Sequence, residues 1–285
     1  MGTSQRLANL LDSAVHTPAA RGLASASREL TGLLLPSLCV LCGERDGAVC
    51  PGCAPHLAAD LLQPFRAERD AAALPLRFTQ PASAPVPVVA AARYGGEASR
   101  ALLAFKDHGR TSVVRFLRPA VYRALGSVPE LLGIQGPFTV VPVPASAAGF
   151  RRRGLDPVEE LLGGPLPPGW TVARGWLAHR RRPLLTAPRH RTSHAGTGSR
   201  QRRSGSRDRF RPTRRLSAEA AEAARNGGRS VVVFDDVMTT GSTLAATWLA
   251  LEHGGIRPAG AVVLAAVTAP GSVGDGGLNS GWGTY

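Results

Sequence analysis

Lysine is almost missing from this chain of 285 residues. Lys106 is the single lysine among 34 basic residues, and the other thirty-three are arginine. A guanidinium is planar and always charged, whereas an ammonium is a compact point charge that fits a phosphate cluster and can lose its proton when buried. Lys106 is therefore a candidate functional residue, with chance retention in an arginine-rich sequence as the alternative.

Long apolar runs are missing as well. The best run, residues 261–267, has the length of a buried strand and falls well short of the roughly 20 residues that cross a membrane as a helix. Charged residues are scattered through the first 30 positions, without the continuous apolar segment of a secretory signal. We expect neither a membrane span nor secretion, and we predict a cytoplasmic location.

Cysteine occurs only four times, as two Cys-x-x-Cys pairs separated by seven residues: Cys39, Cys42, Cys50 and Cys53. Four thiolates at this spacing suit tetrahedral Zn²⁺. Disulfides are the alternative, although a reducing cytosol disfavours them, and an iron–sulfur cluster can use the same ligands. Because zinc would occupy all four sulfurs, we predict a structural metal in a small zinc-ribbon-like module.

Strand and helix patterns alternate after the cysteines. Residues 230–234 form the clearest strand, 243–253 a helix that ends at Gly254, and 261–267 the next strand. This unit predicts an α/β fold with a mostly parallel sheet flanked by helices. Further strands are expected at 86–94, 139–143 and 171–177, and further helices at 97–105, 112–125 and 217–225.

The same patterns predict a domain organisation. Its parts are an N-terminal amphipathic segment (1–35), the four-cysteine zinc module (36–63), a Pro- and Ala-rich linker (64–85), an α/β domain (86–270) and a Gly-rich, disordered tail (271–285). An arginine-rich insertion at 174–215 interrupts the α/β domain.

The loop after the clearest strand has the chemistry of a site for a phosphorylated sugar. Asp235 and Asp236 end the strand and can accept hydrogen bonds from vicinal hydroxyls or approach a divalent cation. The following hydroxyls and backbone N–H groups lie at a helix N-terminus, where a phosphate is favoured; they belong to Thr239, Thr240, Gly241, Ser242 and Thr243. An ordinary N-capped helix is the alternative, but one Ser or Thr suffices for capping.

The segment VVVFDDVMTTGSTL closely resembles the phosphoribosyl pyrophosphate (PRPP) signature of type I phosphoribosyltransferases. The resemblance implies that Asp235 and Asp236 contact the ribose hydroxyls as catalytic residues, and that residues 239–243 bind the 5′-phosphate. It also implies Mg²⁺ bound together with PRPP.

The order of cysteines and PRPP loop is similar to that of the ComF family of competence-associated proteins, over residues 33–267. Shorter pieces agree with it, including Tyr94-Gly95-Gly96, the turn around Lys106 and Val141-Pro142-Val143-Pro144. The resemblance implies a type I phosphoribosyltransferase-like domain, in which Lys106 is catalytic and faces the pyrophosphate. Further candidates on the pyrophosphate side are Pro144, Ala145, Arg151 and Arg153. The family's hood pattern is altered, because Thr197 replaces a leucine and Gly205 an asparagine.

The insertion at 174–215 carries fourteen arginines and one acid, Asp208, and so supplies most of the net charge of +14. Such a block attracts polyanions, either nucleic acid or a phosphorylated small molecule; a solvated loop is the alternative. Its aromatic residues are only Trp176 and Phe210, so at most a salt-sensitive, sequence-blind affinity for single-stranded DNA is expected.

Three functions remain open from the sequence. The first is transfer of a phosphoribosyl group from PRPP to an unknown nitrogen acceptor, associated with DNA uptake. The second is a non-catalytic single-stranded DNA-binding accessory of competence, with a DNA-uptake helicase as partner, and the third is a PRPP sensor.

Overall fold

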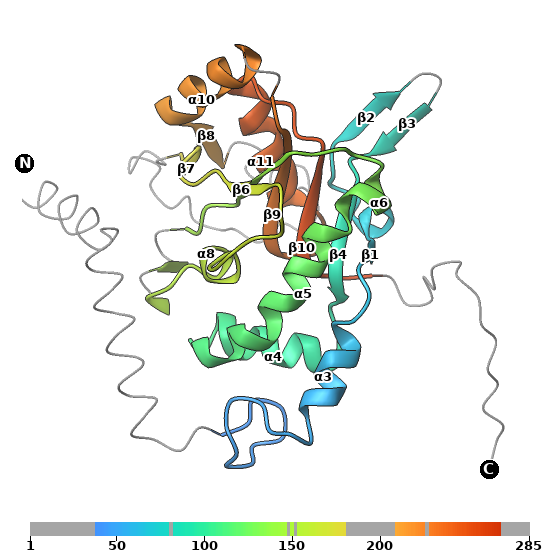
Figure 1. Cartoon of the computed structure of the whole chain (residues 1–285), viewed down its shortest axis with the longest axis vertical. Helices are drawn as coiled ribbons and strands as arrows, with labels where there is room; N and C mark the ends of the chain where they lie inside the picture. The colour runs from blue at the N-terminus through green and yellow to red at the C-terminus, as the bar shows by residue number, and fades with distance from the viewer. Residues whose placement is uncertain are drawn as a thin grey trace, which may run out of the picture.

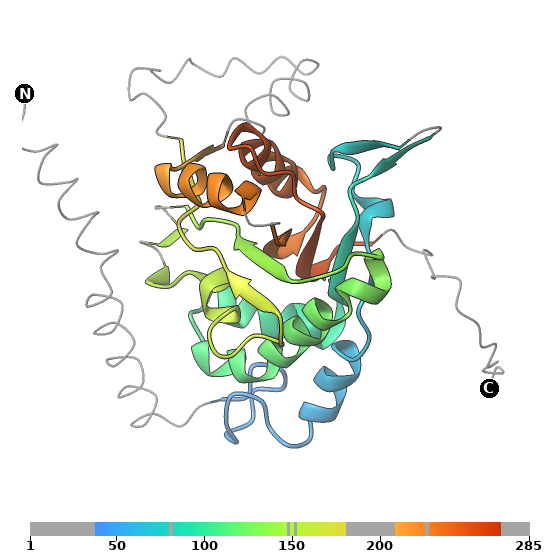
Figure 2. The ribbon, with the colours of Figure 1, turned by 45° about the horizontal axis from the view of Figure 1, so that its top comes forward.

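The computed structural model describes residues 38–79, 82–146, 149–150, 153–180, 209–225 and 228–268. Within them a sheet lies between two layers of helices (Figures 1 and 2). The predicted segment 1–35, the tail 271–285 and most of the arginine-rich insertion lie outside the described residues. No helix of the described ranges is long and apolar enough to cross a membrane.

The main sheet has six strands in the order β1-β4-β10-β9-β5-β6. Every neighbouring pair is parallel except β1 and β4, so the predicted α/β fold with a mostly parallel sheet is confirmed. The strands are β1 (Phe65–Arg66), β4 (Val88–Arg93), β5 (Phe138–Pro142), β6 (Trp170–Val172), β9 (Ser230–Met238) and β10 (Gly260–Ala266). Two hairpins accompany the sheet: β2 (Leu76–Thr79) with β3 (Ala82–Pro85), and β7 (Leu177–His179) with β8 (Phe210–Pro212).

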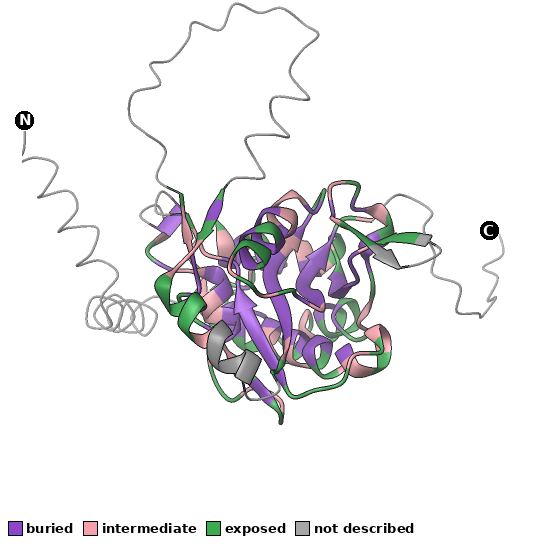
Figure 3. Cartoon of the chain, turned by 90° about the horizontal axis from the view of Figure 1, so that it is seen from above, coloured by how far each residue is buried: buried purple, intermediate pink, exposed green. Residues whose placement is uncertain are grey.

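Helices cover both faces of the sheet, whose four central strands are almost entirely buried (Figure 3). One face packs against the N-terminal helices, with Leu57, Phe105 and Leu117 in a core that includes Phe234. The other packs against α10, α11 and the β7–β8 hairpin, with Leu216 and Leu251 against Val233. The helices are α3 (Ala54–Asp60), η1 (Glu68–Asp70), α4 (Gly96–Lys106), η2 (Thr111–Val113), α5 (Val114–Gly126), α6 (Val128–Leu132), α8 (Pro157–Leu161), α10 (Arg214–Arg225) and α11 (Ser242–His253).

The interval 64–85, which we expected to be a linker, instead contributes β1 to the main sheet and forms the β2–β3 hairpin. It contains β1, η1, β2 and β3. Ala67 donates its backbone N–H to Val88 at 2.9 Å, and the Glu68 carboxylate accepts from the Val88 N–H at 3.2 Å. Proline and alanine hide this role in the sequence, because they break the periodic pattern without preventing short edge strands.

Two strands differ from their predicted bounds. The strand expected at 230–234 continues through Met238, because β10 pairs with it as far as Ala266 opposite Met238. The strand expected at 171–177 divides into β6 and β7, with Gly175 between them at φ 74°. The first difference places both aspartates inside the strand rather than after it.

Candidate functional site

Asp235 and Asp236 lie near the carboxyl end of β9, beside the centre of the sheet. Val233 and Phe234 pack in the two different cores, but Val237 packs in the same core as Phe234. The usual alternation of side chains along a strand is therefore interrupted at the two aspartates. Each aspartate is only 7% exposed. The two carboxylates are therefore buried within β9 rather than exposed after its end, and they lie close enough to affect each other.

Asp236 forms an ion pair with Lys106, the last residue of α4. The Lys106 Nζ lies 2.9 Å from Asp236 Oδ1 and 2.8 Å from Oδ2. The lysine side chain is 31% exposed and the aspartate side chain 9%. The structure thus brings together two residues that are 130 positions apart in the sequence and that were both predicted to belong to the site.

Asp235 is a buried carboxyl next to that ion pair. Burial raises the pKa of Asp235 well above its usual range, and the neighbouring charge of Asp236 raises it further. The Asp236 backbone N–H donates to Asp235 Oδ1 at 2.8 Å and opposes this shift. The two carboxyls therefore differ in their surroundings, because Asp236 is paired with Lys106 whereas burial favours the neutral form of Asp235.

The five residues after Met238 form the turn into α11. Thr239 and Thr240 are exposed, Gly241 is buried at φ 81°, and α11 begins at Ser242 without a side-chain cap. The first N–H groups of a helix have no partner within the helix, so they and the helix dipole favour an anion. These features fit the phosphate site that the sequence predicts at residues 239–243.

Ala73 and Leu74, which the sequence did not mark as part of the site, contact this turn. The Ala73 N–H donates to the Thr240 carbonyl at 2.9 Å. A Cβ on Gly241 would lie 2.8 Å from Leu74 Cδ2 and Cγ, so only glycine leaves room for this close approach. Both supporting residues come from the expected linker, and no local pattern marks a contact over such a separation in sequence.

The loop after β5 carries the pyrophosphate-side candidates. Asp156 accepts from the Ala145 N–H and also caps α8 through Val158 at 3.0 Å. Burial, followed by the charge of Glu159, raises the pKa of Asp156 to about 6. The sequence Asp-Pro before two glutamates is a helix-start signal that could have predicted this cap.

Arg153 lies beside the same loop, whereas Arg151 lies outside the described residues. A Cβ on Gly149 would be 2.7 Å from Arg153 Nη2, which places the guanidinium against the loop backbone. The Nε atom of Arg153 is buried and has no hydrogen-bond partner within the described ranges.

The β7–β8 hairpin connects the two loops. His179 Nε2 lies 3.0 Å from the Pro144 carbonyl oxygen, and Arg209 Nη1 donates to Thr243 Oγ1 at 3.3 Å. Arg180 and Arg209, the described residues that flank positions 181–208 in the sequence, are joined by a backbone hydrogen bond of 2.9 Å at the end of this hairpin. Neither His179 nor Arg209 carries a sequence signal of its own, because each acts through the pairing of distant strands.

The four cysteines gather into one cluster near the start of the described chain. Their sulfur atoms all lie within 4.8 Å of one another, with 3.6 Å between Cys42 Sγ and Cys50 Sγ. Tetrahedral zinc with Zn–S bonds of 2.3 Å requires S–S distances of about 3.8 Å. The donor set therefore fits a metal such as zinc, and all four cysteines are free thiols rather than disulfides.

The Cys39 thiol is the member of this cluster most disposed to ionise. Burial raises its pKa, but backbone N–H groups of Cys50, Cys42 and Leu41 outweigh burial and lower it from 9.0 to about 6. A thiolate is the form that binds metal.

Comparison with known proteins finds a partial relative. The chain is 51% identical over 51 residues to an adenine phosphoribosyltransferase of Mycolicibacterium vanbaalenii. The chain is thus phosphoribosyltransferase-like. The match covers 18% of the chain and 29% of the relative, and no protein-family model matches. The phosphoribosyltransferase-like chain combines this partial similarity with a four-cysteine cluster that could bind a metal.

Proposed function

We propose that the chain binds PRPP together with Mg²⁺ and transfers its phosphoribosyl group to a nitrogen acceptor. The proposal depends above all on the arrangement at the end of β9. Asp236 is held against Lys106, and the exposed Thr239 and Thr240 then lead into the uncapped N-terminus of α11. A carboxylate for a ribose diol and a helix end for a phosphate thus lie within six positions of the chain.

In this proposal the two aspartates bind the ribose hydroxyls and residues 239–243 bind the 5′-phosphate. Lys106 supplies positive charge on the pyrophosphate side, where its partly exposed ammonium can turn from Asp236 toward a phosphate. The unpartnered Nε of Arg153 supports the same side, since a buried donor gains most from an anionic acceptor. The remaining pyrophosphate-side residues of the proposal are Pro144, Ala145 and Arg151.

The proposed reaction is a substitution at C1 of the ribose. When bound, Mg²⁺ neutralises charge on the pyrophosphate leaving group. The acceptor nitrogen forms a bond to C1, the bond from C1 to the pyrophosphate oxygen breaks with its electron pair, and the nitrogen releases a proton. Both carboxylate oxygens of Asp236 contact Lys106, and the Asp235 carboxyl is buried. The residues present therefore fit an Mg²⁺ ion that is bound mainly by the phosphates of the substrate.

Release of pyrophosphate tests transfer directly. The metal-loaded protein is incubated with Mg²⁺, PRPP and a panel of nitrogen heterocycles, with adenine first because the relative is named as an adenine phosphoribosyltransferase. Acceptor-dependent pyrophosphate release that is lost in Asp235→Asn/Asp236→Asn supports the proposal. Saturable PRPP binding without release for any acceptor would instead favour a PRPP sensor.

A role in DNA uptake is the second candidate function. The four-cysteine cluster ahead of a phosphoribosyltransferase-like fold supports the ComF resemblance. Single-stranded DNA binding is supported by the arginines of the insertion and by the contact of Arg209, at its described end, with Thr243 of the proposed phosphate turn. We propose that this insertion binds the phosphate backbone, and that the protein acts in the cytoplasm with a DNA-uptake helicase.

Oligonucleotide binding at several salt concentrations tests the DNA role. Affinity should fall steeply as salt rises, because neutralised phosphates release counterions. Replacement of the arginines between 181 and 208 by glutamine should abolish that affinity while PRPP binding remains. Unchanged oligonucleotide binding by the neutralised variant would exclude the insertion as the binding surface.

A further inference from the structure

We infer that the cysteine module positions Lys106 by holding both ends of helix α4, with Asp60 and Arg110 as the two positioning residues. The module comprises the cysteine loops and α3, residues 38–61. The value of a fixed Lys106 for catalysis rests on the proposed function, but the positioning itself is a property of the protein without ligand.

The first end of α4 has no cap of its own. Its N-cap residue is Gly95, which has no side chain to accept from the helix. Asp60, the last residue of α3, accepts instead: its Oδ2 lies 2.8 Å from the Glu97 nitrogen and 3.1 Å from the Ala98 nitrogen. The module therefore supplies the acceptor that a local Ser, Thr or Asp would normally provide.

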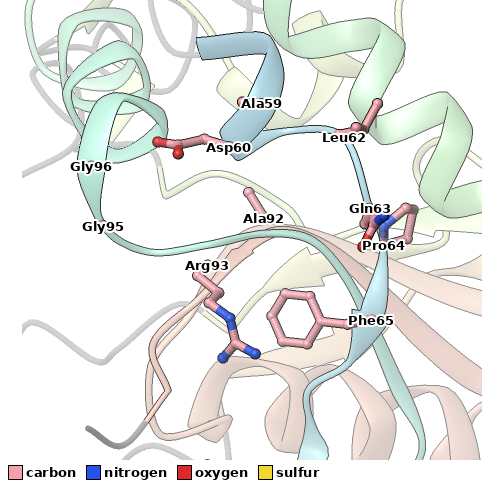
Figure 4. A pocket seen from close by; sticks show the side chains of 10 residues that line it. All are labelled: Ala59, Asp60, Leu62, Gln63, Pro64, Phe65, Ala92, Arg93, Gly95 and Gly96. Atoms are coloured by element: carbon pink, nitrogen blue, oxygen red, sulfur yellow. The ribbon is translucent and has the colours of Figure 1, made fainter. Parts of the chain in front are cut away.

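Close approach of the two helices makes this cap possible. Figure 4 shows Asp60 directed from the end of α3 toward Gly96, across a cleft of about 650 Å³. A Cβ on Gly96, at φ 50°, would lie 2.6 Å from Asp60 Oδ2. The contact thus depends on the absence of a side chain at the first residue of α4.

The second end of α4 is tied to the start of the module. Arg110 follows Lys106 by four residues, and its N–H donates to the Ala104 carbonyl in the last turn of the helix at 3.1 Å. Its Nη2 donates to the carbonyl of Leu38 at 2.5 Å. Leu38 directly precedes Cys39, so this bond joins the end of α4 to the first metal-ligand candidate.

The helix between these ends runs from the end of β4 toward β9. It begins after β4 and ends at Lys106, which contacts Asp236 of β9, with β10 lying between those strands. Leu102 and Phe105 share one core cluster with Leu57 and Leu61 of the module. A shift of the module would therefore move the helix that presents the ammonium to the proposed site.

The rate at which the Lys106 amine is acylated measures how firmly its side chain is held. Lys106 is the only lysine, so no other lysine contributes to the signal. The metal-loaded full chain is treated with an acetylating ester, and the rate of modification at Lys106 is followed by peptide mass spectrometry. We expect Asp60→Ala and Arg110→Ala each to raise this rate about fivefold, the factor by which loss of one cap shifts a local equilibrium.

Matched variants separate positioning from general loosening. Asp46→Ala removes an exposed acid of the module, and Arg100→Ala removes an exposed arginine of α4 that pairs with Glu97; both should keep the wild-type rate. Asp60→Asn retains a carbonyl acceptor for the N–H groups of α4 and should also keep the wild-type acylation rate. Asp236→Asn removes the direct partner and sets the upper limit. Circular dichroism and bound metal confirm that each compared variant is folded.

The outcomes distinguish this inference from the proposed function. Wild-type acylation rates in both Asp60→Ala and Arg110→Ala, with a raised rate in Asp236→Asn, would overturn the positioning role. No increase in Asp236→Asn would also overturn it, because the ion pair would then not restrain Lys106. If the rates follow the expectation but wild-type protein fails to bind Mg²⁺-PRPP, the positioning stands and the proposed function fails.

Discussion

Replacement of Gly241 by alanine tests the phosphate turn and its support by Leu74. Gly241 adopts φ 81°, where an L-residue costs roughly 1–2 kcal/mol. The new Cβ would also lie 2.8 Å from two atoms of Leu74, which is buried and cannot move aside freely. Overpacking of this kind costs about 1–3 kcal/mol. We therefore expect Gly241→Ala to lower the free energy of unfolding by roughly 2–5 kcal/mol.

Gly255 offers a matched control for the backbone cost alone. It has φ 83°, and a Cβ there would meet nothing within 4 Å. Gly255→Ala should therefore lose only about 1–2 kcal/mol. Leu74→Ala should reduce the additional loss in Gly241→Ala, because it removes the opposing atoms.

Urea unfolding measures these differences as shifts of the midpoint at constant slope. Calorimetry with PRPP then shows whether the displaced turn has also lost its phosphate affinity. Equal losses of stability in Gly241→Ala and Gly255→Ala would refute the close contact with Leu74, and no change in either would refute the left-handed turn itself.

Three further predictions concern other parts of the molecule. Since the pKa of Asp156 is raised from 3.8 to about 6, the contribution of Asp156 to stability is present below pH 4 and is lost as the pH rises through 6. Between pH 4 and 7, wild type should therefore lose up to about 3 kcal/mol of its free energy of unfolding relative to Asp156→Asn. A difference between the two proteins in urea unfolding that stays constant with pH would contradict this. Lys106→Met should weaken PRPP binding about tenfold or more but ribose 5-phosphate binding little; equal losses in calorimetry would place Lys106 elsewhere. Removal of metal by a chelator should expose four thiols to a thiol reagent and lower the melting temperature, with one metal ion released per chain; four thiols that react equally fast before chelation would argue against a bound metal.

Local patterns predicted the parts of the fold that depend on local physics. The run of valines in β9, the glycine stop after α11 and the apolar run of β10 give a parallel βαβ unit because each pattern is complete within its own segment. The cysteine cluster was likewise predictable, since two short loops bring each pair of sulfurs together before the pairs meet.

Contacts between distant segments could not be predicted in the same way. That Lys106 and Asp236 belong to one site was expected from a family resemblance, but their ion pair was not, and neither was the support of Gly241 by Leu74. Residues 64–85 contain no regular alternation, because β1 is a two-residue edge strand. The burial of Asp235 and Asp236 within β9 follows from the length of β10, which continues the pairing to Met238.

Calorimetric titration with PRPP and Mg²⁺ tests the central claim most directly. Metal-loaded wild-type protein is compared with Asp235→Asn/Asp236→Asn, whose bound metal and circular dichroism are checked first, and ribose 5-phosphate serves as the ligand without pyrophosphate. The proposed site predicts saturable binding of PRPP by wild type and its loss in the double variant. Absence of saturable binding by wild type, or undiminished affinity in the folded double variant, would contradict a PRPP site at the end of β9.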